Sequence, residues 1–334
     1  MLTLLIGPDW TANRREILNR ISMDVHQKQP GRILMVPELI SHDTERRLCA
    51  AAGDTASRYA EVLSFSRLAR RVSDSVGSAA MECLDKGGRV VAMAAASRAL
   101  AGKLKAYAAL ETKPEFLTGL IDAIDEFKRC CITSETLMHA ARQLDGSFAQ
   151  KLEELALLME SYDALCARGK RDPRDQMSWC LEQLEDSDFA KEHVFYIDGF
   201  PDLTRQNLDI LELLIRESPS VTVSLNCDTV GSKRMAFEKA GETAKQILDC
   251  ARKNGVVHRV KLIPAEKKSL EPVWEKLFQG QIEKGEAKDC LSVYRAESPY
   301  QEAMGAAEQV MALVWGGCRY RDINLVCADM NVYA

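Results

Sequence analysis

Gly7 to Arg14 is the stretch of this chain whose residue types and spacing come closest to phosphate chemistry. The apolar run Leu2 to Ile6 leads into it and a helical pattern follows, which is the setting of a nucleotide-binding P-loop. That loop consists of a glycine, four variable residues and then Gly-Lys-Ser/Thr. Two interpretations are open, a decayed ATP site or an ordinary turn. The eight residues here are Gly7, Pro8, Asp9, Trp10, Thr11, Ala12, Asn13 and Arg14.

Only the first glycine of the template is kept. Ala12 stands at the second glycine, Asn13 at the lysine and Arg14 at the hydroxyl residue. Without the lysine the β and γ phosphates lose their main point charge, and an arginine cannot ligate magnesium as a serine or threonine would. We therefore expect a degenerate nucleotide site that neither binds nor hydrolyses ATP. Trp10 is expected to plug the space that a nucleotide would fill.

Asp198 is a second candidate for the same chemistry. It follows the apolar run His193 to Ile197, and in P-loop ATPases an acidic residue at a strand end holds the magnesium ion. In helicases a glutamate follows and orients the attacking water, but Gly199 stands there. Taken alone, Asp-Gly after a strand favours a tight turn. The order of P-loop-like turn, long helical segment and acidic strand end favours the functional interpretation.

The elements that would position these residues predict an α/β fold. Short runs rich in branched apolar residues are separated by helical periodicity, as is typical of buried parallel strands. Between Phe65 and His193 the apolar spacing is helical instead, with Phe148 expected on one apolar face. The predicted strands are Leu2–Ile6, Arg32–Val36, Glu61–Phe65, His193–Ile197 and Val221–Leu225, with a further one at Val256–Ile263.

Three domains are predicted from this pattern. A discontinuous α/β domain covers residues 1–75 and 186–285, and a helical subdomain covers residues 76–185. Residues 286–334 read as the start of a second α/β domain, with a helix at Tyr300–Trp315 and a strand at Ile323–Cys327. Because this second domain is too short to be complete, we expect a fragment of a larger protein.

Composition limits the class of protein. The 334 residues are 46% hydrophobic and 28% charged, and no apolar run is long enough to cross a bilayer. The eleven cysteines show no CxxC pair and no metal-ligand spacing, so most are expected to be buried thiols of a cytoplasmic protein. The formal charge of −5 excludes a globally basic nucleic-acid binder, which leaves a local DNA contact open.

Several short stretches resemble one family, the B subunit of the AddAB (RexAB) ATP-dependent helicase-nuclease of bacterial recombinational repair. They are spread over nearly the whole chain in the family's order. The stretches are Met35–Glu38, Val62–Ala69, Ile124–Lys128, Lys151–Leu152, Tyr196–Phe200 and Tyr320–Ile323.

The resemblance implies a RecA-like, superfamily-one helicase-like P-loop domain with a helical insertion, followed by the truncated start of a second RecA-like domain. It also implies a heterodimer with an AddA-type subunit that supplies the motor, and a scaffold that binds single- and double-stranded DNA and scans for Chi. In the family, ATP and magnesium bind at the P-loop, whereas an iron-sulfur cluster and a magnesium-dependent nuclease lie in the carboxy-terminal half. No cofactor and no catalytic or metal-ligating residue is expected in these 334 residues.

DNA contact is expected at Ser64, Phe65, Ser66 and Arg67, and less strongly at Thr44. The stretch follows a predicted strand where related helicases touch the single strand, and hydroxyl, aromatic and cationic groups suit phosphate contact with base stacking. The alternative is that Phe65 packs in the core and the arginines coat a helix. Two other functions stay open, namely a working ATPase with an atypical P-loop and a protein-interaction module without a DNA role.

Overall fold

The computed structural model describes residues 1–77, 82–108, 113–265 and 291–333. The chain forms two compact units, Met1–Glu266 and Lys267–Ala334. The predicted boundary between residues 285 and 286 lies outside the described residues. The first unit contains the sheet, the helical segment and all candidate site residues.

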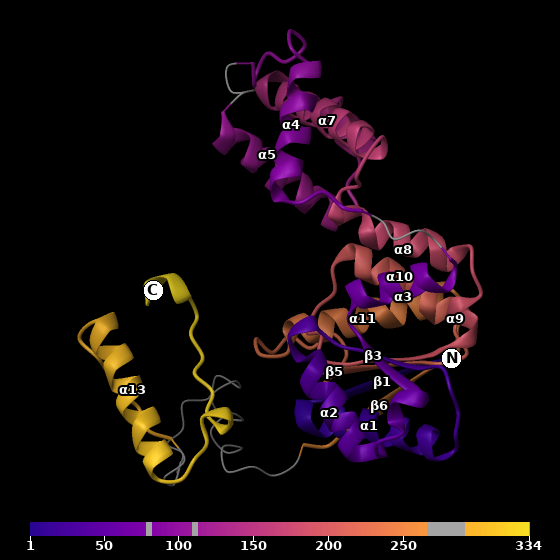
Figure 1. Ribbon diagram of the computed structural model, residues 1–334, viewed down its shortest axis with the longest axis vertical. Coiled ribbons are helices and arrows are strands. Elements are labelled where there is room, and N and C mark those ends of the chain that lie inside the picture. Colours follow the sequence, from indigo (N-terminus) through magenta and orange to yellow (C-terminus); the bar gives the residue numbers. More distant parts are fainter. Residues whose placement is uncertain (78–81, 109–112, 266–290, 334) are drawn as a thin grey trace. The chain divides into compact units, whose positions relative to one another are not determined.

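The sheet of the first unit has six parallel strands in the order β3-β2-β4-β5-β1-β6 (Figure 1). All six residues of β1 are buried, as expected for a strand covered on both faces. The predicted α/β fold with a parallel sheet is confirmed, and it is consistent with a RecA-like domain. The strands are β1 (Leu2–Gly7), β2 (Arg32–Met35), β3 (Ala60–Leu63), β4 (Val194–Ile197), β5 (Val221–Asn226) and β6 (His258–Leu262).

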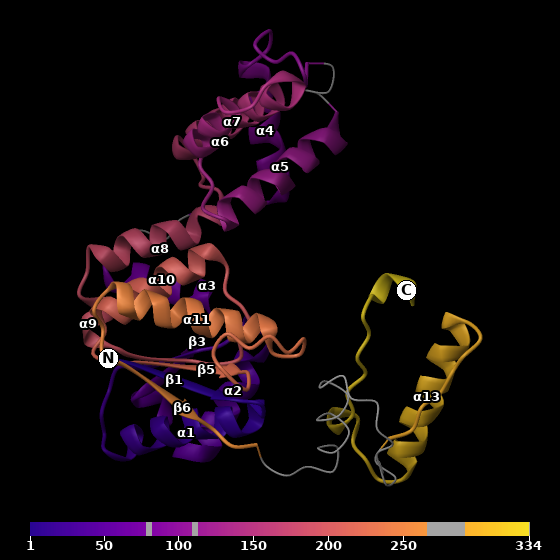
Figure 2. The same ribbon diagram turned by 180° about the vertical axis from the view of Figure 1, so that it is seen from behind.

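Helices cover both faces of this sheet (Figures 1 and 2). On one face lie α1 (Trp10–His26) and α2 (Ser41–Ala52). On the other lie α3 (Phe65–Ser75), α10 (Arg205–Glu217) and α11 (Glu238–Lys253), with the short α9 (Phe189–Glu192) beside them. The chain moves one way across the sheet from β1 to β3 and back from β3 to β6. Right-handed crossovers therefore put the two sets of helices on opposite faces.

This topology brings the candidate residues to one edge. All strands are parallel, so their carboxyl ends lie together, and β1 leaves toward one face whereas its neighbour β5 leaves toward the other. Ligands of open α/β sheets bind in the crevice at such a reversal. Gly7, Asp198 and Asn226 stand at the ends of β1, β4 and β5. The site is thus created by the fold from segments far apart in the sequence.

The helical segment between β3 and β4 has a core of its own, which includes Met93, Leu120, Ile124 and Tyr162. Its incoming and outgoing segments are joined side by side. The amide of Leu84 donates to the carbonyl of Arg171 over 2.8 Å, and the amide of Arg171 donates to Glu82 over 3.0 Å. We call residues 82–84 and 170–172 the neck. The helices are α4 (Lys86–Ala99), α5 (Pro114–Arg129), α6 (Ser134–Ala141) and α7 (Gly146–Ala167).

After the neck come the short helix η3 (Pro173–Asp175) and α8 (Gln176–Glu185). Helix α8 packs on α3 and α10, the helices of one sheet face. Gln183 accepts a hydrogen bond from the hydroxyl of Ser73 over 2.9 Å, which ties α8 to α3. The predicted limits of the helical subdomain, 76 and 185, stay predictions.

Three expectations about single elements were wrong. Phe148 is 59% exposed, because in the first turn of α7 the neighbouring Ala149 faces the protein instead. Only Cys166, Cys180 and Cys227 are buried among the ten described cysteines, since most of the others lie at helix ends or on outer faces. Residues 291–333 contain the long helix α13 (Pro299–Trp315) and no strand, because Ile323–Cys327 has no strand to pair with among them.

Candidate functional site

The connection between β1 and α1 consists of two residues, Pro8 and Asp9. Trp10 to Arg14 already belong to the helix, so their backbone does not form the open loop that wraps phosphates in a P-loop. Close packing requires a glycine at position 7. A Cβ atom at this position would lie 2.4 Å from the carbonyl oxygen of Ile263, immediately after β6.

The amino terminus of α1 is occupied by a carboxylate. Asp9 is buried, and its Oδ1 accepts hydrogen bonds from the amide of Thr11 over 3.0 Å and from the Thr11 hydroxyl. This is N-capping, in which a side-chain oxygen satisfies helix amides that would otherwise bind an anion. A phosphate placed here would meet a negative charge instead of free amide groups.

Asn13, which stands at the position of the P-loop lysine, forms hydrogen bonds with the backbone. Its side chain is 1% exposed, and its Nδ2 donates to the carbonyls of Gly7 and Leu225, each over 3.1 Å. With its amide oriented to satisfy both groups, Asn226 donates to Gly7 over 3.0 Å and to Pro8 over 2.9 Å. These two amides bind the end of β1 to α1 and β5, so both Asn13 and Asn226 have a structural role.

Arg14 and Asp198 form a buried ion pair. The Nε of Arg14 lies 2.6 Å from Oδ2 of Asp198, and the two side chains are 9% and 6% exposed. The other carboxylate oxygen accepts from the hydroxyl of Ser224. The guanidinium also lies 5.0 Å from the ring centre of Trp10, at cation–π distance. The acid expected to hold magnesium is therefore neutralised by a side chain of the same site.

Gly199 forms the turn that ends β4. Its φ of +83° lies in the left-handed region that favours glycine, so a conformational need explains this residue. The pocket beside it has a volume of about 200 Å³ and is lined by residues that include Ile40, Phe200 and Pro201. Trp10 is 50% exposed and lines the pocket without filling it.

ATP with magnesium does not fit these residues. The pocket is smaller than the roughly 300–1,000 Å³ of ordinary small-molecule sites. The helix terminus is capped by Asp9, and the carboxylate of Asp198 already has Arg14 as its counterion. Sequence reasoning brought Gly7–Arg14 and Asp198 together, and the structure places them together. Sequence reasoning did not predict the ion pair, because it treated Arg14 only as a lost magnesium ligand.

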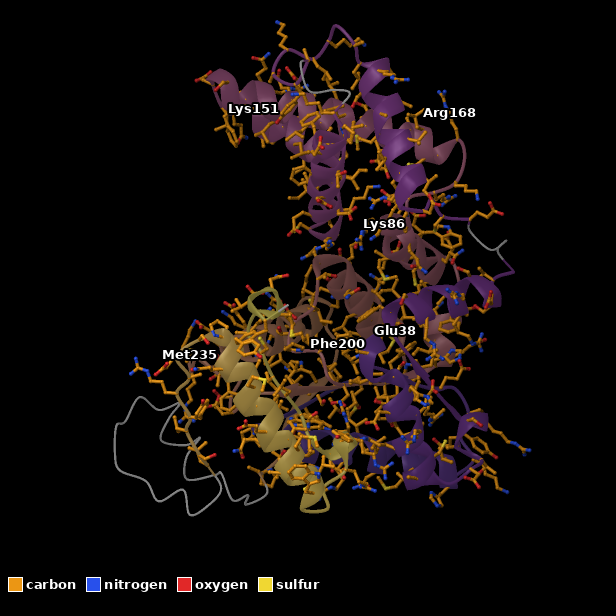
Figure 3. All side chains as sticks on the ribbon, turned by 60° about the vertical axis from the view of Figure 1, so that its left-hand side comes forward. Glu38, Lys86, Lys151, Arg168, Phe200 and Met235 are labelled. Atoms are coloured by element: carbon orange, nitrogen blue, oxygen red, sulfur yellow. The ribbon has the colours of Figure 1, made fainter. Side chains whose placement is uncertain are left out.

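Four of the five expected DNA-contact residues, Ser64 to Arg67, lie at the end of β3, on the same edge of the sheet. The Ser64 hydroxyl accepts from the amide of Arg67 over 3.3 Å and so caps α3, and it donates to Glu38. Phe65 is 7% exposed and packs edge-on against Phe200, with ring centres 5.4 Å apart. Figure 3 shows Glu38 and Phe200 at this edge. Phe65 thus follows the core-packing alternative.

The remaining three candidates differ in exposure. Ser66 is exposed, and Arg67 is half-buried with its Nη1 3.0 Å from Oε1 of Glu45. Thr44 is 1% exposed, and its hydroxyl donates to the carbonyl of Ile40 over 2.8 Å, one turn back in the chain. Ser66 and Arg67 therefore offer side-chain atoms at the surface, whereas Thr44 does not.

A second group of buried charges lies beside the neck, and sequence reasoning missed it. The ammonium of Lys128 lies 2.8 Å from Asp163, 3.1 Å from Asp172 and 2.7 Å from Asp175. Burial alone would lower the pKa of Lys128, but the three carboxylates outweigh burial and raise it. A sequence signal existed, since Lys128 continues the spacing of buried residues on α5.

Arg89 extends this group to α4. It pairs with Asp125 and lies 3.3 Å from Asp172, and its Nε donates to the hydroxyl of Tyr162 over 3.2 Å. Arg174 pairs with Asp125 over 2.8 Å. We call these residues the neck cluster. Its members are Arg89, Asp125, Lys128, Asp163, Asp172, Arg174 and Asp175.

No described helix is both long and apolar enough to span a membrane.

Comparison with known proteins identifies relatives along nearly the whole chain. The B subunit of the ATP-dependent helicase/deoxyribonuclease of Thermoanaerobacter sp. (strain X514) is 28% identical over 315 residues, which cover 90% of this chain and 27% of that protein. The proteins of the same name from Desulforudis audaxviator and Clostridium perfringens (strain 13 / Type A) are 28% and 24% identical, over 99% of this chain and 30% of theirs.

The chain therefore spans less than a third of the length of these relatives. A family model described as ADDB, N-terminal matches residues 4–273. That match covers most of the chain, and it contains nearly the whole sheet and both groups of candidate site residues. The chain belongs to the family of ADDB amino-terminal domains.

Proposed function

We propose that this chain is the amino-terminal part of a helicase/deoxyribonuclease B subunit that binds single-stranded DNA and neither binds nor hydrolyses ATP. It keeps the fold of a motor domain as a scaffold, and a partner of the AddA type supplies the motor. The role belongs to double-strand break repair by homologous recombination, with Chi scanning as the specific task. The names of the relatives, which describe the B subunit of a helicase/deoxyribonuclease, support this proposal.

The two-residue connection between β1 and α1 carries the ATP-free part of the proposal. A P-loop needs open backbone whose amides point at the phosphates. Here the helix begins at Trp10, and the carboxylate of Asp9 occupies its amino terminus. A single restored side chain, such as Asn13→Lys, would therefore not rebuild the loop. The working ATPase with an atypical P-loop is the less favoured alternative for the same reason.

A calorimetric titration with Mg-ATP tests this part directly. No saturable heat is expected at millimolar nucleotide. Trp10 borders the pocket, so its fluorescence gives a second measurement, and Trp10→Phe identifies the signal of this residue among the four tryptophans. Saturable, magnesium-dependent binding that quenches Trp10 would contradict the proposal and favour the working ATPase.

The DNA part is supported by the surface position of Ser66 and Arg67, which directly follow Phe65 at the carboxyl edge of the sheet. Fluorescence anisotropy with a labelled single strand should show binding that weakens as salt rises, because neutralised phosphates release counterions. A chain that shows no affinity even at low salt would instead be a protein-interaction module. The formal charge of −5 is the observation that favours this second candidate.

A further inference from the structure

We propose that Arg14 is a tethered counterion that takes the place of a divalent metal ion at Asp198. The edge of the sheet then keeps one charge state whatever the concentration of magnesium or nucleotide. This inference rests on the proposed function only in requiring that the wild-type chain binds no Mg-ATP. It assigns a specific task to a residue that otherwise looks like a lost magnesium ligand.

The geometry of the pair supports a substitution for metal. The Nε of Arg14 lies 2.6 Å from Oδ2 of Asp198, and the hydroxyl of Ser224 donates to Oδ1. Both carboxylate oxygens therefore already accept a donor. A metal ion at this carboxylate would have to displace the guanidinium and would be repelled by its charge.

Trp10 holds the guanidinium from the other side. It lies one helical turn before Arg14 on α1, so both side chains project from the same face of the helix. The guanidinium lies 5.0 Å from the centre of the indole ring, and planar guanidinium groups stack favourably on aromatic rings. The tryptophan thus orients the counterion instead of plugging a nucleotide site.

The charge balance of the pocket agrees with this assignment. Among the described residues that line it, Arg14 and Asp198 are the ionisable ones, and their charges cancel. A carboxylate alone in this place would be costly because it is 6% exposed, and it would attract a cation. A neutral pocket attracts neither a divalent cation nor a phosphate. The link between α1 and the end of β4 is consequently permanent, where in an ATPase it depends on the bound ligand.

Removing the tethered charge should expose a latent cation site. We expect Arg14→Ser to leave Asp198 beside two hydroxyl groups, that of the introduced side chain and that of Ser224. In metal-free buffer this variant should melt several degrees below wild type, and about 10 mM Mg²⁺ or Mn²⁺ should recover much of the loss, because a ligand that binds only the folded state stabilises it. Wild type should show no such response.

Arg20→Ser is the matched control. Arg20 lies on the same helix and pairs with Glu16 over 2.9 Å, away from the pocket lining. This variant should not respond to either metal ion. The double variant Arg14→Ser/Asp198→Asn should also lose the response, which assigns the ion to the Asp198 carboxylate. Bound Mn²⁺ can be counted by electron paramagnetic resonance, with about one ion expected per Arg14→Ser chain and none per wild-type chain.

The inference fails if folded Arg14→Ser shows no metal response, or if wild type binds Mn²⁺ equally well. Should Arg14→Ser not fold, the pair Arg14→Gln and Asp198→Asn decides the question. The double variant should then melt higher than Arg14→Gln alone, and equal melting temperatures would overturn the proposal. Saturable Mg-ATP binding by wild type would instead contradict the proposed function, so the two failures are distinguishable.

Discussion

The Arg14–Asp198 pair and the neck cluster both bury charge, but their cations have different numbers of partners. In the neck cluster each central cation has several acidic partners, and the group joins α4, α5, α7 and η3. At the edge of the sheet one cation meets one carboxylate, and both line a pocket. In the neck cluster the central Lys128 and Asp172 are 6% and 0% exposed, whereas Asp163 and Asp175 at its rim are each 40% exposed. The two arrangements therefore differ in how many carboxylates depend on one cation.

This difference separates buried charges that stabilise the fold from buried charges that stand where a ligand would bind. Three carboxylates share Lys128, so removal of this cation leaves several acids without their partner. Removal of Arg14 leaves one carboxylate, which water or an ion in the pocket can compensate. The neck cluster is therefore read as the support of the helical segment, and the edge pair as a substitute for a bound ligand.

The largest expected effect is at Lys128, and it tests this comparison most directly. Lys128→Met keeps most of the side-chain volume but leaves three carboxylates without their shared cation. We expect the free energy of unfolding to fall by about 3–5 kcal/mol. Arg14→Met should cost about 1–3 kcal/mol, because Asp198 can be hydrated from the pocket. Urea unfolding followed by circular dichroism measures both values.

Lys191→Met is the control for this experiment. Lys191 pairs with Asp188 on the surface, so its substitution should leave the free energy of unfolding unchanged. Equal losses at Lys128 and Arg14 would remove the distinction between a cation shared by three carboxylates and a cation paired with one.

An intermediate effect is expected from pH. Burial alone would raise the pKa of Asp125, but hydrogen bonds from Arg89 and Arg174 outweigh it and hold this pKa below the ordinary value of 3.8. The ionised carboxylate therefore contributes stability that is present above the unfolded pKa and is lost as pH falls through the folded pKa. Unfolding measured at a series of pH values below about 5 should show a shallower slope in Asp125→Asn. An unchanged slope would show that the pKa of Asp125 is the same in the folded and the unfolded chain, which would contradict the prediction.

The smallest effect on stability, and the most informative for DNA, is expected at Arg67. Its pair with Glu45 is about 40% exposed on both sides, so Arg67→Ala should change the free energy of unfolding by less than about 1 kcal/mol. If Arg67 contacts a phosphate, single-strand affinity falls and the salt slope decreases by about one. Arg71→Ala is the matched control, one turn further along α3 and similarly paired with Glu61. Equal losses in both variants would indicate a general charge effect instead of a contact.

The sheet could be predicted from the sequence because buried parallel strands leave a local signal. The strand predicted at Leu2–Ile6 is β1 with one added residue, and the runs before Asp198 and Asn226 are likewise strands. The strand predicted at Ile323–Cys327 failed, since a strand depends on a pairing partner that no local pattern reveals. Periodicity reports which residues could be buried, and pairing decides whether a strand forms.

The site was predicted only in part, for a similar reason. The substitution at Asn13 already argues against phosphate binding, whereas the capping of α1 by Asp9 was found only in the structure. The partner of Arg14 is 184 residues away, and the burial of Thr44 depends on the turn before α2. The neck cluster joins elements from Arg89 to Asp175, and apart from Lys128, which follows the spacing of the buried face of α5, its charges look like ordinary surface residues in the sequence. Contacts over such separations depend on the topology of the fold, which cannot be deduced from the local sequence around each residue.

The hydrogen-bonded neck also has a consequence for folding. Because Leu84 and Arg171 are joined by a hydrogen bond, the long stretch between β3 and β4 behaves in loop-closure terms like a shorter connection once the helical segment has formed. The entropy of bringing the two halves of the sheet together is then set by the residues outside the neck, and it grows only slowly with loop length in any case. The helical segment could therefore lengthen, shrink or be replaced by a tight turn during evolution without changing the order of the strands.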